Sequence, residues 1–119
     1  MIATLRAVSL GCDAPTALME FERSILGGEV AFANESFAAL QGADAIWLTA
    51  QRVEERVLPL WPAGDSFKQA HLELAVTELV DSVAAGARRA DIQPSPDRWQ
   101  VFIDPAGHPF CLTTLIATE

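Results

Sequence analysis

The sequence has 119 residues, half of them hydrophobic and a fifth charged, a composition typical of one folded globular domain. The formal net charge of −8 argues against nucleic acid as a partner, because no basic stripe is present to neutralise phosphates. No apolar run approaches the about 20 residues that a membrane span needs, so we expect a soluble chain.

Two cysteines, Cys12 and Cys111, lie far apart in the sequence and match no metal-ligand spacing. Because the N-terminus carries no secretory signal, we interpret both as reduced thiols in a cytoplasmic protein. Small buried hydrophobic residues of this kind need no further function.

The first half of the chain predicts the order β-α-β-β-β. Residues 2–10 form an apolar strand, and a helix follows with Asp13 as its cap and Pro15 in its first turn. Apolar residues recur at helical spacing until Gly27 and Gly28, where we expect the helix to end. Three strands are then predicted over residues 29–33, 36–41 and 45–53, separated by turns.

The second half repeats this order after a loop that contains Pro59, Pro62 and Gly64. A strand is predicted over residues 69–76, a helix over 77–87, and strands over 88–92, 98–103 and 109–117. Each half exposes one apolar sheet face that it cannot bury alone, so the halves should pair in one domain. We therefore predict an α+β fold of two βαβββ modules in a single domain over residues 1–119, with module 1 at about 1–53, a linker at about 54–68 and module 2 at about 69–119.

Four segments carry a family resemblance. They are Phe21–Gly28 after the first strand, Trp61–Asp65 in the loop, His71–Val76 at the start of the second half, and Asp104–Leu112 before the end of the last strand. Together they resemble the vicinal oxygen chelate superfamily, which includes glyoxalase I, bleomycin-resistance proteins and extradiol dioxygenases. The Asp-Pro-x-Gly turn is the most specific piece, and Trp61–Asp65 is similar to the small bacterial glyoxalase-like branch. The resemblance implies a curved mixed sheet with a concave cleft and helices on the outer face.

The resemblance also implies where a metal would be held, because metal-dependent members place one ligand on the first and last strand of each half. These positions fall on Leu5, Gln51, His71 and Cys111. Leu5 has no donor atom and Gln51 offers only a neutral amide, so His71, Gln51 and Cys111 form a weak ligand set. We expect the usual divalent-metal site to be incomplete, and the resemblance makes no other cofactor certain.

Strand parity predicts which side chains face the cleft, because alternate residues of a strand point to opposite faces. His71 and Glu73 share a face, where His71 suits a general base or ligand anchor and Glu73 an orienting group or base. The alternative is that both are structural, with His71 bonded within the sheet and Glu73 solvated. Predicted ligand-binding residues are Trp47, Thr49, Gln51, Trp61 and Cys111.

Two functions stay open at this point. One is binding or sequestration of a small organic molecule, as in the bleomycin-resistance members, without an intact metal site. The other is a metal-dependent lyase, isomerase or dioxygenase that uses His71 and Glu73, and a third option is a domain that kept the fold without the chemistry. The resemblance implies a homodimer in which a second chain completes the cleft.

Overall fold

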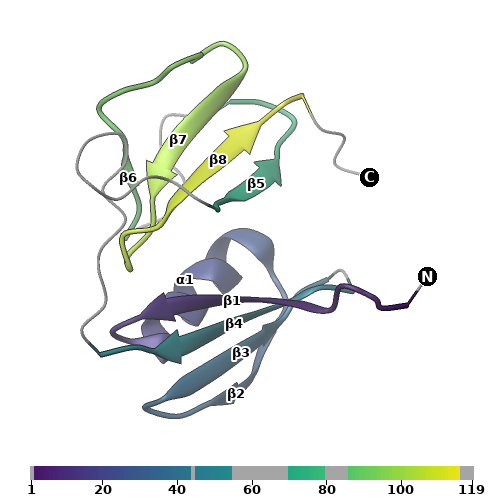
Figure 1. Cartoon of the computed structure of the whole chain (residues 1–119). Coiled ribbons are helices and arrows are strands. Elements are labelled where there is room, and N and C mark those ends of the chain that lie inside the picture. Colours follow the sequence, from purple (N-terminus) through teal and green to yellow (C-terminus); the bar gives the residue numbers. More distant parts are fainter. Residues whose placement is uncertain (1, 44, 55–69, 80–85, 116–119) are drawn as a thin grey trace. The chain divides into compact units, whose positions relative to one another are not determined.

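The computed structural model describes residues 2–43, 45–54, 70–79 and 86–115, and the chain divides into two units, Met1–Arg56 and Val57–Glu119 (Figure 1). The first unit contains strand β1 (Ala7–Cys12), helix α1 (Pro15–Leu26) and strands β2 (Glu29–Ala33), β3 (Phe37–Gln41) and β4 (Trp47–Arg52). The second unit contains strands β5 (Leu72–Ala75), β6 (Arg88–Arg89), β7 (Trp99–Ile103) and β8 (Pro109–Thr113).

Both units share one strand topology. The sheet order is β1-β4-β3-β2 in the first unit and β5-β8-β7-β6 in the second. In each unit the first and last strands pair in parallel and the remaining strands pair antiparallel. This repeat confirms the predicted α+β class and its two βαβββ modules. No helix within the described residues is long and apolar enough to cross a membrane.

The helix predicted over residues 77–87 falls mainly on residues 80–85, which lie outside the described residues. Its described ends, residues 77–79 and 86–87, are not helical. The predicted linker at about 54–68, including Trp61, also lies largely outside the described residues, which exclude 55–69.

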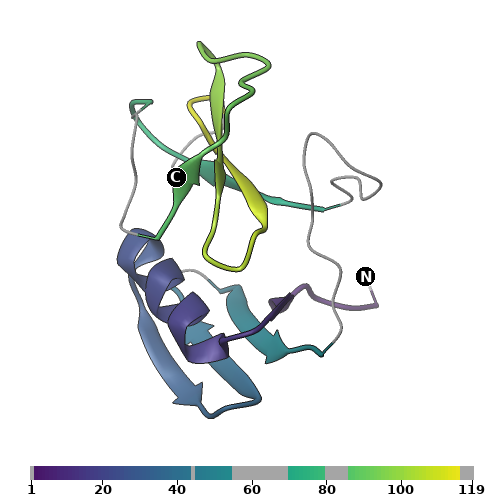
Figure 2. The same cartoon turned by 90° about the vertical axis from the view of Figure 1, so that its left-hand side faces the viewer.

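Helix α1 packs against strands β2, β3 and β4, and Figure 2 shows it lying along one face of that sheet. The predicted Asp13 cap was wrong, because the cap residue is Ala14 and it makes no side-chain cap hydrogen bond. Proline prefers the first helical position, where its missing N–H costs nothing, so Pro15 starts the helix and makes its predecessor the cap. The buried residues recur at helical spacing and are Pro15, Leu18, Met19, Phe21 and Glu22.

Two glycines end the helix as predicted. Gly27 has φ 75° and Gly28 has φ 88°, a backbone region that favours glycine. The Gly27 N–H donates to the Arg23 carbonyl at 2.9 Å. A side chain at Gly28 would place its Cβ only 2.2 Å from the Gln41 carbonyl oxygen. The backbone directly before β2 therefore passes the end of β3 at a distance that only glycine allows.

The first strand is shorter than predicted, because it begins at Ala7 and not at Ile2. Its residues pair one to one with β4, from Ala7 with Trp47 to Cys12 with Arg52. The strand therefore starts where its partner strand starts, although the apolar residues begin earlier. Leu5 lies before the strand and is 66% exposed.

The turn between β7 and β8 is the predicted Asp-Pro-Ala-Gly segment. The Asp104 Oδ1 atom accepts the N–H groups of Ala106 at 2.8 Å and His108 at 2.9 Å. Gly107 adopts φ 90° and its N–H donates to the Asp104 carbonyl. Asp104 is buried, so its carboxylate replaces water as the acceptor for these backbone groups.

Strand β6 is only two residues long, where a five-residue strand was predicted. The pairing of β7 beyond it is completed by the amide side chain of Gln93. Its Nε2 donates to the carbonyls of Ala90 and Val101, both at 2.9 Å, and its Oε1 accepts the Val101 N–H at 2.8 Å. The Gln93 side chain thus makes the hydrogen bonds to Val101 that a longer β6 would make with its backbone.

Candidate functional site

The candidate site lies on one face of the second sheet, and the strand register determines its members. Glu73 on β5 pairs with Cys111 on β8, and Cys111 pairs with Val101 on β7. Paired residues point to the same face of a sheet, so these three side chains stand in a row across it. The opposite face carries Leu72, Leu74, Phe102, Phe110 and Leu112.

The polar part of this face is a pair formed by His71 and Glu73. His71 stands directly before β5, and its Nε2 lies 2.7 Å from the Glu73 Oε1. This distance is a hydrogen bond between the imidazole and the carboxyl group. The side chains are 24% and 43% exposed, so both reach solvent. The pair is therefore positioned to contact a ligand or to exchange a proton.

The apolar part of the face surrounds Cys111. This residue is 2% exposed and packs in a buried cluster with Ala90 and Val101, against which Trp99 rests half-buried. The thiol is therefore held by the core of the unit, while the neighbouring His71–Glu73 pair is open.

Donor atoms of His71, Glu73 and Cys111 all lie within 4.8 Å of one another. An imidazole, a carboxylate and a thiol in one group fit a thiophilic cation such as zinc better than a hard cation. This group differs from the predicted ligand set, because Glu73 takes the place of Gln51. Its three members come from β8 and the start of β5.

The other predicted site residues lie in the first unit or outside the described residues. Trp47, Thr49 and Gln51 alternate along β4 and share one face of that sheet, as strand parity predicted. Trp47 and Thr49 are half-buried and Gln51 is exposed. Trp61 lies outside the described residues. Leu5 offers no donor and stands before β1, so the four-position metal arrangement is incomplete at its first position.

Sequence reasoning placed Glu73 beside His71 but did not count it as a metal ligand. The expected arrangement had one ligand on each of four strands, whereas His71 and Glu73 are two donors near one strand. The His-x-Glu spacing was the available signal, because residues two apart on a strand share a face.

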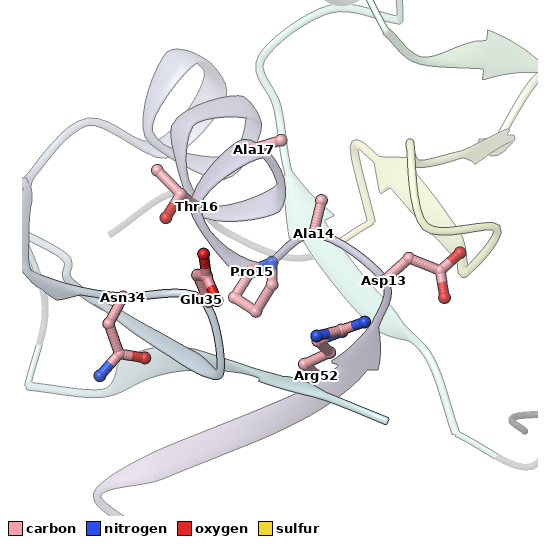
Figure 3. A pocket seen from close by; sticks show the side chains of 8 residues that line it. All are labelled: Asp13, Ala14, Pro15, Thr16, Ala17, Asn34, Glu35 and Arg52. Carbon is pink, nitrogen blue, oxygen red and sulfur yellow. The ribbon is translucent and has the colours of Figure 1, made fainter. Parts of the chain in front are cut away.

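A second feature is an open depression of about 640 Å³ at the start of α1 (Figure 3). Asn34 in its wall uses its Oδ1 to accept the backbone N–H groups of Ser36 and Phe37, so this side chain holds the β2–β3 turn. One cation beside two carboxylates gives the depression no clear preference for an anionic ligand. Its lining residues are Asp13, Ala14, Pro15, Thr16, Ala17, Asn34, Glu35 and Arg52.

Comparisons with known proteins agree with this architecture. A family model described as a glyoxalase-like domain matches residues 7–113. The search of curated proteins found no match. Among solved structures, the fosfomycin resistance protein FosX from Listeria monocytogenes has a TM-score of 0.70 at 17% identity, covering 98% of this chain and 94% of that chain.

Two further structures are similar at comparable coverage. A possible glyoxalase from Bacillus cereus has a TM-score of 0.68 at 16% identity, covering 92% of this chain and 97% of that chain. The bleomycin-binding protein from Streptomyces verticillus, complexed with copper(II)-bleomycin, has a TM-score of 0.59 at 22% identity, covering 95% and 98%. At identities this low, the similarity in structure shows a shared fold alone.

Proposed function

The chain belongs to the glyoxalase-like domain family of the vicinal oxygen chelate superfamily, and from this premise we propose that it binds a small organic molecule at the His71–Glu73 pair. The observation that carries the proposal is the contrast on one sheet face. A partly exposed hydrogen-bonded pair stands beside buried apolar side chains, Val101 and Cys111. Small-molecule sites combine such apolar walls with a few polar groups that fix orientation.

The ligand class follows from the groups available. His71 and Glu73 would bind a polar group of the ligand, and half-buried Trp99 on the same face offers an aromatic surface. A planar organic molecule with a hydroxyl, carbonyl or amine group would offer the polar group to His71 and Glu73 and its flat face to Trp99. The copper(II)-bleomycin held by one similar structure is a precedent for a bulky organic ligand on this fold.

Tryptophan fluorescence tests the proposal directly. The protein is titrated with a panel of planar aromatic compounds that carry one polar substituent, and saturable quenching is expected for at least one of them. Because Trp99 packs beside Cys111, the quenching should fall in Trp99→Phe. His71→Ala should weaken binding about tenfold, the loss of one hydrogen bond to a charged or polar group.

A matched control is His108→Ala, because His108 is the only other histidine and lies in the β7–β8 turn. Its affinity for the same compound should equal that of the unchanged protein. A flat response across the panel, or equal weakening by the two histidine variants, would contradict binding at the His71–Glu73 pair.

The second candidate is catalysis at the same pair, as a lyase, isomerase or dioxygenase. It is favoured by the 2.7 Å contact, which orients the imidazole as a general acid–base group requires. Any compound that binds is incubated with the protein and recovered for chromatography and mass analysis, since an isomer differs from its parent compound in retention time and not in mass. Conversion that disappears in both His71→Ala and Glu73→Gln supports the enzyme, and recovery of unchanged compound supports binding alone.

We further propose that the protein works as a homodimer in the cytoplasm. The buried thiols of Cys12 and Cys111 agree with a reducing compartment. Light scattering on a sizing column should give twice the 12.8 kDa chain mass, and a monomer at micromolar concentration would contradict the dimer.

A further inference from the structure

The side chains of His71, Glu73 and Cys111 carry a second inference, which does not depend on the proposed organic ligand. We propose that they form a binding site for a thiophilic divalent cation of the zinc class, built entirely within the second unit. The three donor atoms lie within 4.8 Å of one another, and they belong to β8, to its parallel neighbour β5 and to the residue directly before β5. All three residues belong to the second unit.

The donor chemistry selects the cation. A thiolate and a carboxylate supply two negative charges, which balance a divalent ion, and a neutral imidazole supplies the third bond. Catalytic zinc sites have three protein ligands of these types and leave a fourth position open. Magnesium and calcium prefer oxygen ligands alone, so one carboxylate beside a sulfur and a nitrogen binds them poorly.

The geometry needs only a small adjustment. Metal–ligand bonds of about 2.0–2.3 Å in a tetrahedron separate the donor atoms by about 3.3–3.8 Å. The present separations run from 2.7 Å between His71 and Glu73 up to 4.8 Å within the group. Glu73 is 43% exposed and free of core packing, so its carboxylate can swing away from the imidazole. Cys111 stays fixed, because its neighbours Ala90 and Val101 are buried with it.

The register gives this group its rigidity. Glu73 and Cys111 are Cα partners in the β5–β8 ladder, and the ladder continues on both sides with Leu72–Phe110 and Leu74–Leu112. Two of the three donors therefore start from backbone positions that are fixed by strand pairing. Donors on rigid paired strands lose little conformational entropy when they bind a metal.

Cobalt(II) is the probe of choice, because it follows zinc in its ligands and a bound thiolate adds a charge-transfer absorption. Protein without a polyhistidine tag is stripped with chelator, dialysed and titrated with Co²⁺. One equivalent should produce the thiolate band, an equivalent of Zn²⁺ should remove it, and millimolar Mg²⁺ should leave it unchanged.

Variants identify the ligands. The band should vanish in Cys111→Ser and persist in Cys12→Ser, which alters the other buried cysteine. Glu73→Gln changes an exposed side chain, so the fold is retained. Outer-sphere changes already weaken metal binding by about 10–100-fold, so loss of this direct ligand should raise the dissociation constant at least tenfold.

Several results would overturn the site. They are the absence of a thiolate band in the unchanged protein, a band that survives in Cys111→Ser, a band that is lost in Cys12→Ser, and equal affinity in Glu73→Gln. Circular dichroism of each variant separates loss of the site from loss of the fold. Because the readout is metal absorption, failure here leaves the fluorescence test of the organic ligand intact.

Discussion

Alanine at Gly28 should destabilise the protein more than alanine at Gly27, although both glycines have positive φ. A non-glycine residue in such a backbone region costs about 1–3 kcal/mol, and this cost applies to both substitutions. At Gly27 a Cβ would meet nothing within 4 Å. At Gly28 it would stand 2.2 Å from the Gln41 carbonyl oxygen and 2.9 Å from the Gly42 Cα.

The contact at Gly28 involves backbone and not a flexible side chain, so it can be relieved only by moving the start of β2 away from the end of β3. Glu29 pairs with Gln41 at this point, so the movement strains the ladder. Overpacking of this kind costs about 1–3 kcal/mol. We therefore expect losses of about 2 kcal/mol for Gly27→Ala and about 4 kcal/mol for Gly28→Ala.

Urea unfolding, monitored by circular dichroism, measures both losses of unfolding free energy. The unfolding midpoints can be compared when the variants have the same m-value. Gly27→Ala is the matched control, because it carries the backbone cost without the clash. Equal losses in the two variants would refute the close approach of the helix end to β3, and a larger loss at Gly27 would refute the assignment of the strained position.

Three further predictions concern polar side chains of the second unit. Asp104→Ala should cost about 3 kcal/mol, because two backbone N–H groups lose a carboxylate acceptor, whereas Asp104→Asn keeps an oxygen and should cost about 1 kcal/mol in the same unfolding assay. Gln93→Ala should cost about 2 kcal/mol, and the Val101 amide should exchange its hydrogen faster, since the Val101 N–H loses its acceptor while the Val101 carbonyl keeps only the Ala90 N–H. Gln100→Met should raise the melting temperature, because the buried Gln100 Oε1 has no hydrogen-bond partner within the described residues and its removal relieves about 1 kcal/mol. A lower melting temperature would mean that the amide is satisfied.

The sequence was informative where a local rule decides the structure. Pro15 and Gly27 define helix α1 because one fixes φ and the other tolerates a positive φ. Asp104 and Gly107 define a turn for similar local reasons. Strand limits were less accurate, since the extent of β1 depends on where β4 runs, and pairing between distant segments leaves no local pattern.

The candidate site also combines a part that local sequence rules predict with a part that depends on the pairing of distant strands. Strand parity placed His71 and Glu73 on one face, because alternation along a strand is local. The closeness of Cys111 to Glu73 depends on the register of two strands separated by 38 positions in the sequence, and no periodicity reveals it. The roles assigned to His71, Glu73 and the ligand-binding residues stay predictions until the binding and metal experiments are done.

The Gln93 amide has a consequence for how copies of this chain can associate. It occupies both outward backbone groups of Val101, and the outward N–H of Trp99 donates to the Ser95 carbonyl at 3.0 Å. An incoming strand would find the N–H and carbonyl of Val101 and the N–H of Trp99 already hydrogen-bonded. The Gln93 side chain therefore blocks strand addition to β7 at Val101, as a charged or bulged edge does in other sheets.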